Sequence, residues 1–116
     1  MRQIFCKFLG AAAISLAWMG NAMADVNVGV IFSLTGPAAS LGNETRKSVE
    51  LFPKTIGKEK VNYIVLDDAT DPTSAVKNAR KLVEENNVDA LFGPNLTSAG
   101  VAIADVANEK RVPLLS

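Results

Sequence analysis

The sequence predicts an α/β fold with a partial, doubly wound parallel sheet in the order β-α-β-α-β-α-β. Three observations support this prediction: four short runs of apolar residues, three helical patterns between them, and no strict polar–apolar alternation within the runs. Strands without such alternation are covered on both faces, as in a parallel sheet whose helical crossovers are right-handed.

The expected strands are the four apolar runs at residues 26–32, 61–66, 88–92 and 112–115. The expected helices between them span residues 43–52, 72–85 and 98–108. The 72–85 helix is the clearest, because Asp71 can accept backbone N–H bonds as its N-cap and Pro72 suits the first helical position. Pro53 should end the first helix, since proline disfavours helix at the residue before it.

Residues 1–24 have the three parts of a cleavable secretory signal peptide. Two basic residues come first, and residues 8–19 then form an apolar stretch that is too short to span a bilayer as a stable helix. Ala22 and Ala24 then place small side chains at the two positions that signal peptidase reads. We therefore expect export to the periplasm and a mature protein that begins at Asp25. The alternatives are a buried N-terminal helix and an anchor that is never removed.

The composition beyond residue 24 argues against nucleic-acid binding and against catalysis. Without Arg2 and Lys7, ten of the twelve basic residues remain against twelve acidic ones, a formal charge of −2. Such a domain lacks the basic surface that binds nucleic acid or anionic lipid. It has no histidine, and the only cysteine, Cys6, lies in the signal peptide. This composition weakens the case for an enzyme, and we expect no catalytic activity, no metal and no cofactor.

Two loops lie where ligands bind in open α/β sheets, beyond the carboxyl ends of the strands. They span residues 33–42 after the first strand and 93–100 after the third. In the second loop, Thr97 and Ser98 bring hydroxyl groups to a helix N-terminus, whose free N–H groups and positive dipole end attract an anion such as a carboxylate. The alternative is that Thr97 or Ser98 simply caps its own helix.

Other kinds of site have less support. No Gly-x-Gly-x-x-Gly or Gly-Lys-Ser/Thr phosphate motif occurs. Asp67 and Asp68 follow the second strand, but adjacent carboxylates on a strand point in different directions, so we expect them to end the strand and begin a turn rather than to bind a metal. An exported hydrolase would need a Gly-x-Ser-x-Gly elbow and a histidine, and the sequence has neither.

Several segments in this order resemble type 1 periplasmic solute-binding proteins of the branched-chain amino-acid (Leu/Ile/Val) class. They are the opening strand and loop, the acidic turn into the second helix, and the third and fourth strands: residues 28–37 with Leu41 and Gly42, 66–76, 88–94 and 112–116. The resemblance implies the first part of the N-terminal lobe of a two-lobed receptor. Such a receptor closes on a small amino acid or related acid and delivers it to the ABC permease of an importer.

The same resemblance implies ligand contacts. Thr97 matches the position that holds the ligand's carboxylate or ammonium group, and Asn95 and Leu96 match neighbours that line the same cleft. Leu41 matches a position where family members often place an aromatic residue against the ligand side chain. Together with Ser98 from the loop pattern, these residues form the predicted site for a branched-chain amino acid or related small carboxylate.

The sequence departs from the family pattern at its end. Family members run to several hundred residues, whereas this sequence stops at Ser116, just before a second set of ligand contacts. We therefore expect residues 25–116 to be a truncated N-terminal part of the ligand-binding lobe, marginally stable and without tight binding alone. The alternatives to a transport receptor are an extracytoplasmic sensing domain of the same fold and a non-functional remnant.

Overall fold

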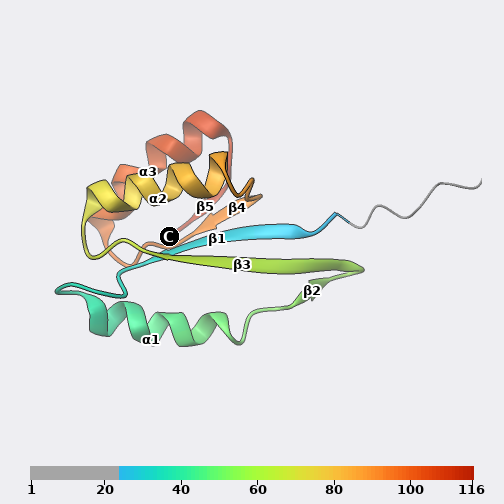
Figure 1. The fold of residues 1–116 in the computed structure, drawn as a ribbon, viewed down its shortest axis with the longest axis horizontal. Coiled ribbons are helices and arrows are strands. Elements are labelled where there is room, and N and C mark those ends of the chain that lie inside the picture. The colour runs from blue at the N-terminus through green and yellow to red at the C-terminus, as the bar shows by residue number, and fades with distance from the viewer. Residues whose placement is uncertain (1–23) are drawn as a thin grey trace, which may run out of the picture.

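The computed structural model describes residues 24–116, so nearly all of the predicted signal peptide lies outside the described residues. The chain folds into a five-stranded sheet with three helices (Figure 1). In chain order the elements are β1 (Val26–Phe32), α1 (Ala39–Val49), β2 (Thr55–Ile56), β3 (Glu59–Asp67), α2 (Pro72–Glu84), β4 (Ala90–Phe92), α3 (Thr97–Lys110) and β5 (Leu114–Leu115).

The sheet has the strand order β2-β3-β1-β4-β5, and every pair except β2–β3 is parallel. The predicted α/β fold and its doubly wound parallel sheet are therefore confirmed. The antiparallel strand β2 was not predicted, and it pairs only Thr55 and Ile56 with Lys60 and Glu59. It forms a tight hairpin with β3 through Gly57, whose φ of 61° is accessible to glycine at little cost.

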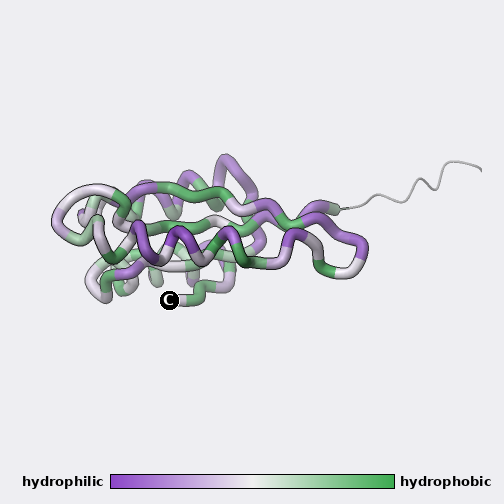
Figure 2. Tube along the Cα trace, turned by 90° about the horizontal axis from the view of Figure 1, so that it is seen from below, coloured by the Kyte–Doolittle hydropathy of each residue, from purple (hydrophilic) through white to green (hydrophobic). Residues whose placement is uncertain are grey.

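Helices cover both faces of the sheet, α1 on one side and α2 with α3 on the other (Figure 1). Successive residues of a strand point to opposite faces. Accordingly, Ile31 of β1 lies in the core beneath α2 and α3, whereas Val30 and Phe32 lie in the core beneath α1. Figure 2 shows the resulting hydrophobic colouring along the central strands.

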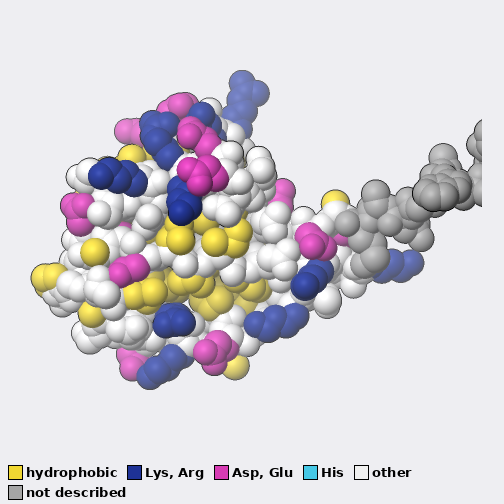
Figure 3. All heavy atoms as spheres, viewed as in Figure 1, with side chains coloured by type: hydrophobic (Ala, Val, Ile, Leu, Met, Phe, Trp, Pro, Cys, Tyr) yellow, Lys and Arg dark blue, Asp and Glu magenta, His cyan; other side chains and the backbone are white. Residues whose placement is uncertain are grey.

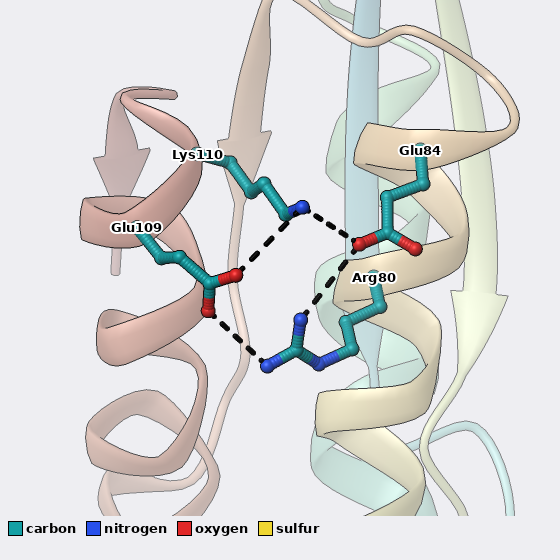
Figure 4. Close-up of polar contacts among 4 residues, drawn as sticks. All are labelled: Arg80, Glu84, Glu109 and Lys110. Atoms are coloured by element: carbon teal, nitrogen blue, oxygen red, sulfur yellow. Dashed lines mark hydrogen bonds and ion pairs between the residues drawn. The ribbon is translucent and has the colours of Figure 1, made fainter.

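The larger core joins the two helices α2 and α3 to the sheet. Its fully buried members include Ala75, Ala79, Leu82, Leu91 and Ile103. At the surface above this core, Arg80 and Glu84 of α2 form ion pairs with Glu109 and Lys110 of α3 (Figure 4). No helix within residues 24–116 has the length and apolar character needed to cross a membrane.

Helix α1 begins at Ala39 rather than at the predicted residue 43, and it ends at Val49 rather than at 52. The N–H of Ala39 donates to Gly36 O at 3.1 Å, and the φ of Gly36 is 82°, so the turn at this glycine leads directly into the helix. Asn43 therefore lies inside the helix. Its side-chain amide donates to Leu34 O and Ala39 O at 3.2 and 2.8 Å.

The other two helices lie close to their predicted positions but begin in different ways. Asp71 caps α2 as expected, since its side chain accepts hydrogen bonds from the N–H groups of Thr73 and Ser74. Helix α3 begins at Thr97 after an N-cap, Leu96, that makes no side-chain cap bond. A side chain therefore caps the N-terminus of α2, whereas α3 begins without a side-chain cap from the described residues.

Candidate functional site

The candidate site lies at the carboxyl ends of β1 and β4. After β1 the chain turns into α1 on one face of the sheet, and after β4 it turns into α3 on the other face (Figure 1). Adjacent parallel strands whose helices leave to opposite faces create a crevice, and ligands of open α/β sheets bind at such a switch point. Both loops singled out in the sequence, 33–42 and 93–100, begin at these strand ends.

A glycine fixes the course of the loop after β4. Gly93 has a φ of 89°, and a Cβ built on it would lie 2.2 Å from Ile31 O of the neighbouring strand. Any larger residue would therefore push this loop away from β1. The Gly93–Pro94 peptide bond is cis. The chain then continues through Asn95 and Leu96 into α3, which begins at Thr97.

The N-terminus of α3 has backbone donors for which residues 24–116 supply no acceptor. The first helical hydrogen bond runs from Gly100 N–H to Leu96 O at 2.9 Å, so the N–H groups of Thr97, Ser98 and Ala99 precede the helical ladder. No side chain of the described part of the chain caps them, and Thr97 and Ser98 are exposed. The alternative that Thr97 or Ser98 caps its own helix is therefore wrong.

A cavity of about 430 Å³ opens beside this helix end. Three of the predicted site residues line it, namely Asn95, Leu96 and Thr97, together with residues of α3 and β5 that include Gly100 and Leu114. Ser98 is exposed one position further along α3 and is not part of the lining. The cavity thus combines apolar walls with a helix end that offers N–H and hydroxyl donors.

Leu41 does not line this cavity, but hydrogen bonds connect it to the same loop. Asn95 Nδ2 donates to Thr45 Oγ1 at 2.9 Å, and Thr45 Oγ1 donates to Leu41 O at 2.9 Å. Because the hydroxyl proton of Thr45 is used on Leu41, the Asn95 amide must present its NH₂ group to Thr45. Leu41 itself is 50% exposed at the start of α1. The structure therefore joins α1 to the β4–α3 loop across the crevice.

Asp67 holds the loop after β1 in place. Its carboxylate accepts hydrogen bonds from the N–H groups of Leu34 and Ala69, both at 2.8 Å, and from Thr35 Oγ1 at 2.6 Å. Burial opposes ionisation, but the bonds from the Thr35 hydroxyl and from the backbone of Ala69, Leu34 and Thr35 outweigh it and lower the pKa of Asp67. The ionised carboxylate is thus the state that fits this loop.

Asp68 is fully buried and ties the same two segments together. Its Oδ1 accepts from Ser33 Oγ at 2.7 Å and from Thr70 N–H at 2.9 Å. Ala69 and Thr70 both have a positive φ, of 52° and 65°, and the two aspartates bind their N–H groups. The acidic pair therefore ends β3 and begins a turn, as the sequence indicated. Within residues 24–116 no cluster of ligating side chains suited to a metal was found.

Sequence reasoning missed the structural tie between the acidic turn and the loop after β1. It also missed Thr45, which lies within helix α1 and not in either of the two predicted loops, and Ser116, which follows β5 and lines the cavity. The sequence did contain one signal for this tie, the hydroxyl residues Ser33 and Thr35 in the loop after β1. In the structure these hydroxyls donate hydrogen bonds to Asp68 and Asp67. Pairing between segments so far apart in sequence needs the three-dimensional structure.

Comparison with known proteins places this geometry in a family. Residues 25–116 match the family model described as periplasmic binding protein. The chain belongs to this family. It is 31% identical over 112 residues to "Leu/Ile/Val-binding protein homolog 3" of Brucella melitensis, covering 91% of this chain and 30% of that protein. The resemblance to the branched-chain amino-acid class of periplasmic binding proteins is therefore confirmed.

Solved structures agree with this assignment. An extracellular ligand-binding receptor from Rhodopseudomonas palustris HaA2 is 46% identical with a TM-score of 0.75, covering 78% of this chain and 25% of that one. A solute-binding protein of an ABC transporter from R. palustris BisB5, in complex with 3,4-dihydroxybenzoic acid, is 29% identical with a TM-score of 0.75, covering 78% of this chain and 26% of that one. The chain thus spans about 30% or less of the length of these proteins.

Proposed function

We propose that this chain is the N-terminal part of the ligand-binding lobe of an exported solute receptor, and that it binds the carboxylate of a small organic acid at the N-terminus of α3. The observation that carries the proposal is the contrast between two helix ends. The N-terminus of α2 is closed by the Asp71 carboxylate, whereas the N–H groups of Thr97 and Ser98 have no acceptor among the described residues. A ligand carboxylate would occupy at α3 the place that Asp71 takes at α2.

The ligand class that we propose is a branched-chain amino acid or related small carboxylate. The relatives named as Leu/Ile/Val-binding proteins and the R. palustris protein in complex with 3,4-dihydroxybenzoic acid support a carboxylate joined to an aliphatic or aromatic body. In this chain, Thr97 would hold the carboxylate, with Asn95 and Leu96 beside it. The exposed Leu41 would contact the apolar body from the other side of the crevice.

The proposal also covers location and partner. The signal-peptide pattern of residues 1–24, together with membership of a periplasmic family, supports export and cleavage before Asp25. The similarity to a solute-binding protein of an ABC transporter supports an ABC permease as the partner of the whole receptor. A protein of residues 25–116 recovered from the periplasm, with its mass measured by mass spectrometry, would support export. A product that retains residue 1 would count against it.

The ligand site can be tested by titrating the isotope-labelled chain and following its backbone amides by NMR. With L-leucine or 3,4-dihydroxybenzoate we expect a Kd of about 1 mM or weaker, because only one side of a closing cleft is present. The amides of residues 95–100 should shift most. L-leucinamide, which lacks the carboxylate, should leave them unchanged.

A matched pair of variants assigns the effect to one hydroxyl. T97V removes the hydroxyl at the open helix end and should weaken L-leucine binding about fivefold, the value of one hydrogen bond. T73V removes an exposed hydroxyl from the first turn of α2, which Asp71 already occupies, and should leave binding unchanged. Equal shifts with L-leucinamide, or shifts confined to other parts of the sheet, would refute the proposed site.

A further inference from the structure

The side-chain amide of Asn95 has one end in use and the other end unused. Its Nδ2 donates to Thr45 Oγ1 at 2.9 Å, and the Thr45 hydroxyl proton is itself used on Leu41 O. The amide therefore cannot be turned end for end without losing one of these two bonds. Asn95 Oδ1 is thus the unused end. It is buried, and no donor within residues 24–116 bonds to it.

This unused oxygen lies close in sequence to unused donors. A buried polar atom without a partner costs free energy, and nearly all such atoms in folded proteins have one. The N–H groups of Thr97 and Ser98 follow Asn95 by two and three residues, and they too have no acceptor in the described part of the chain. The chain thus presents donors and an acceptor side by side without bonding them to each other.

The backbone brings Asn95 and Thr97 to the same side. Leu96 between them is extended, with a φ of −106° and a ψ of 132°. Side chains that flank an extended residue point in the same direction. Both residues line the cavity of about 430 Å³. Because χ2 of asparagine is a soft torsion, a small rotation can present Oδ1 to this cavity.

The cavity offers few other acceptors for a donor group of a ligand. Besides Asn95, its polar side chains are the hydroxyls of Thr97 and Ser116, and none of its lining residues within 24–116 is acidic. Figure 3 shows that the end of the molecule where β1 and β4 end is mostly uncharged on this face. The positive end of the α3 dipole also disfavours a cation placed against it. Asn95 Oδ1 is therefore the acceptor best suited to a ligand donor.

We propose that Asn95 Oδ1 accepts a hydrogen bond from an N–H or O–H group on the carbon next to the ligand's carboxylate. This inference rests on the proposed function, because the carboxylate itself binds at the start of α3. One ligand then satisfies both unused sets of groups. Its carboxylate accepts from the N–H groups of Thr97 and Ser98, and its neighbouring substituent donates to Asn95. Asn95 thereby selects α-amino or α-hydroxy acids over acids without such a substituent.

Three ligands with the same carbon skeleton test the proposal. L-leucine, L-2-hydroxyisocaproate and isocaproate carry an ammonium group, a hydroxyl group and a hydrogen atom at the α-carbon. The full chain is expressed from its own start codon with isotope labels, and each ligand is titrated by NMR. If the donor is the ammonium group, isocaproate should bind about tenfold more weakly than L-leucine. If it is the hydroxyl group, isocaproate should bind about fivefold more weakly than the hydroxy acid.

The ¹³C shift of the Asn95 side-chain carbonyl reports the contact directly. It should move with the preferred ligand and stay in place with isocaproate, although isocaproate still shifts the amides of residues 97–99. Equal affinities for all three ligands with an unchanged carbonyl shift would overturn the role of Asn95 and leave the carboxylate site intact. Amides 97–99 that respond to none of the ligands would overturn the proposed function itself, and this inference with it.

A matched pair of variants separates the oxygen of Asn95 from its tie to α1. N95L removes the oxygen and also the bond to Thr45, and it should bind the three ligands equally. T45V removes the same bond to α1 but leaves Asn95 Oδ1 in place, so it should keep the preference. A preference that survives in N95L, or one that N95L and T45V lose equally, would overturn the direct contact between Asn95 and the ligand.

Discussion

Gly42 in α1 offers a sharp test of how the helix sits on the sheet. A Cβ built on Gly42 would lie 1.9 Å from Ser33 O and 2.5 Å from Ser33 C, which are both backbone atoms. Real Cβ atoms essentially never approach closer than 3.0 Å, so G42A must move α1 away from the end of β1 by about 1 Å. This movement would loosen the packing of Val49 against Val30 and Phe32.

The two contributions to G42A have opposite signs. Helix propensity alone favours alanine over glycine by about 1 kcal/mol inside a helix. Overpacking costs about 1–3 kcal/mol, and contact with backbone rather than a flexible side chain puts this site at the upper end. We therefore expect a net loss of about 2 kcal/mol, which lowers Tm by about 8–16 °C in a domain of this size.

The matched control is G100A in α3. A Cβ at Gly100 would find its nearest neighbours at 3.8 and 3.9 Å, so only the propensity gain of about 0.5–1 kcal/mol remains. Urea unfolding followed by circular dichroism gives the midpoint and slope for both variants and for the parent. If G42A were as stable as G100A, the close approach of α1 to Ser33 would be refuted.

Three further predictions use the same unfolding assay. D71A removes the side chain that caps α2 and should lower stability by about 1 kcal/mol, and an unchanged midpoint would contradict the cap. Hydrogen bonds lower the pKa of Asp67 and Asp71 in the folded state, so these residues stabilise the fold fully above the unfolded pKa of about 4 and lose this effect as the pH falls through the folded pKa values. D67N should therefore reduce the slope of unfolding free energy against pH in acid. A slope equal to that of the parent would contradict the role of Asp67. R80A breaks the ion pair between Arg80 and Glu109, whose side chains are 44% and 54% exposed. The free energy of unfolding should therefore fall by less than about 1 kcal/mol, and by less still at high salt. A larger decrease that does not depend on salt would show that Arg80 acts through packing.

Most of the fold could be predicted because its signals are local. Apolar runs predicted β1, β3, β4 and β5, and Asp71 with Pro72 predicted the start of α2. The misses have physical reasons. Strand β2 has two exposed residues and exists only because the turn at Gly57 brings it back onto β3. The start of α1 depends on the backbone turn at Gly36, which residue periodicity does not show.

The site was predicted less completely, because a sequence does not show which polar groups are already hydrogen-bonded within the fold. Asp67 and Asp68 were visible in the sequence, but only the structure shows their carboxylates bound to the loop after β1. Thr97 was equally visible, and only the structure shows that its helix end is not capped by a side chain from residues 24–116. Residue types therefore indicated which loops carry polar groups. Only the hydrogen bonds in the structure show which of these groups stabilise the fold and which could bind a ligand.

Hydrogen bonds hold both loops beside the crevice in place. The loop after β1 is fixed to β3 by the Asp67 carboxylate, and α1 is joined to the β4–α3 loop by the bond from Asn95 to Thr45. The donors at the start of α3 therefore sit on a frame that is held from both sides before any ligand arrives. The proposed anion site is thus preformed, and ligand binding there should cost little conformational entropy.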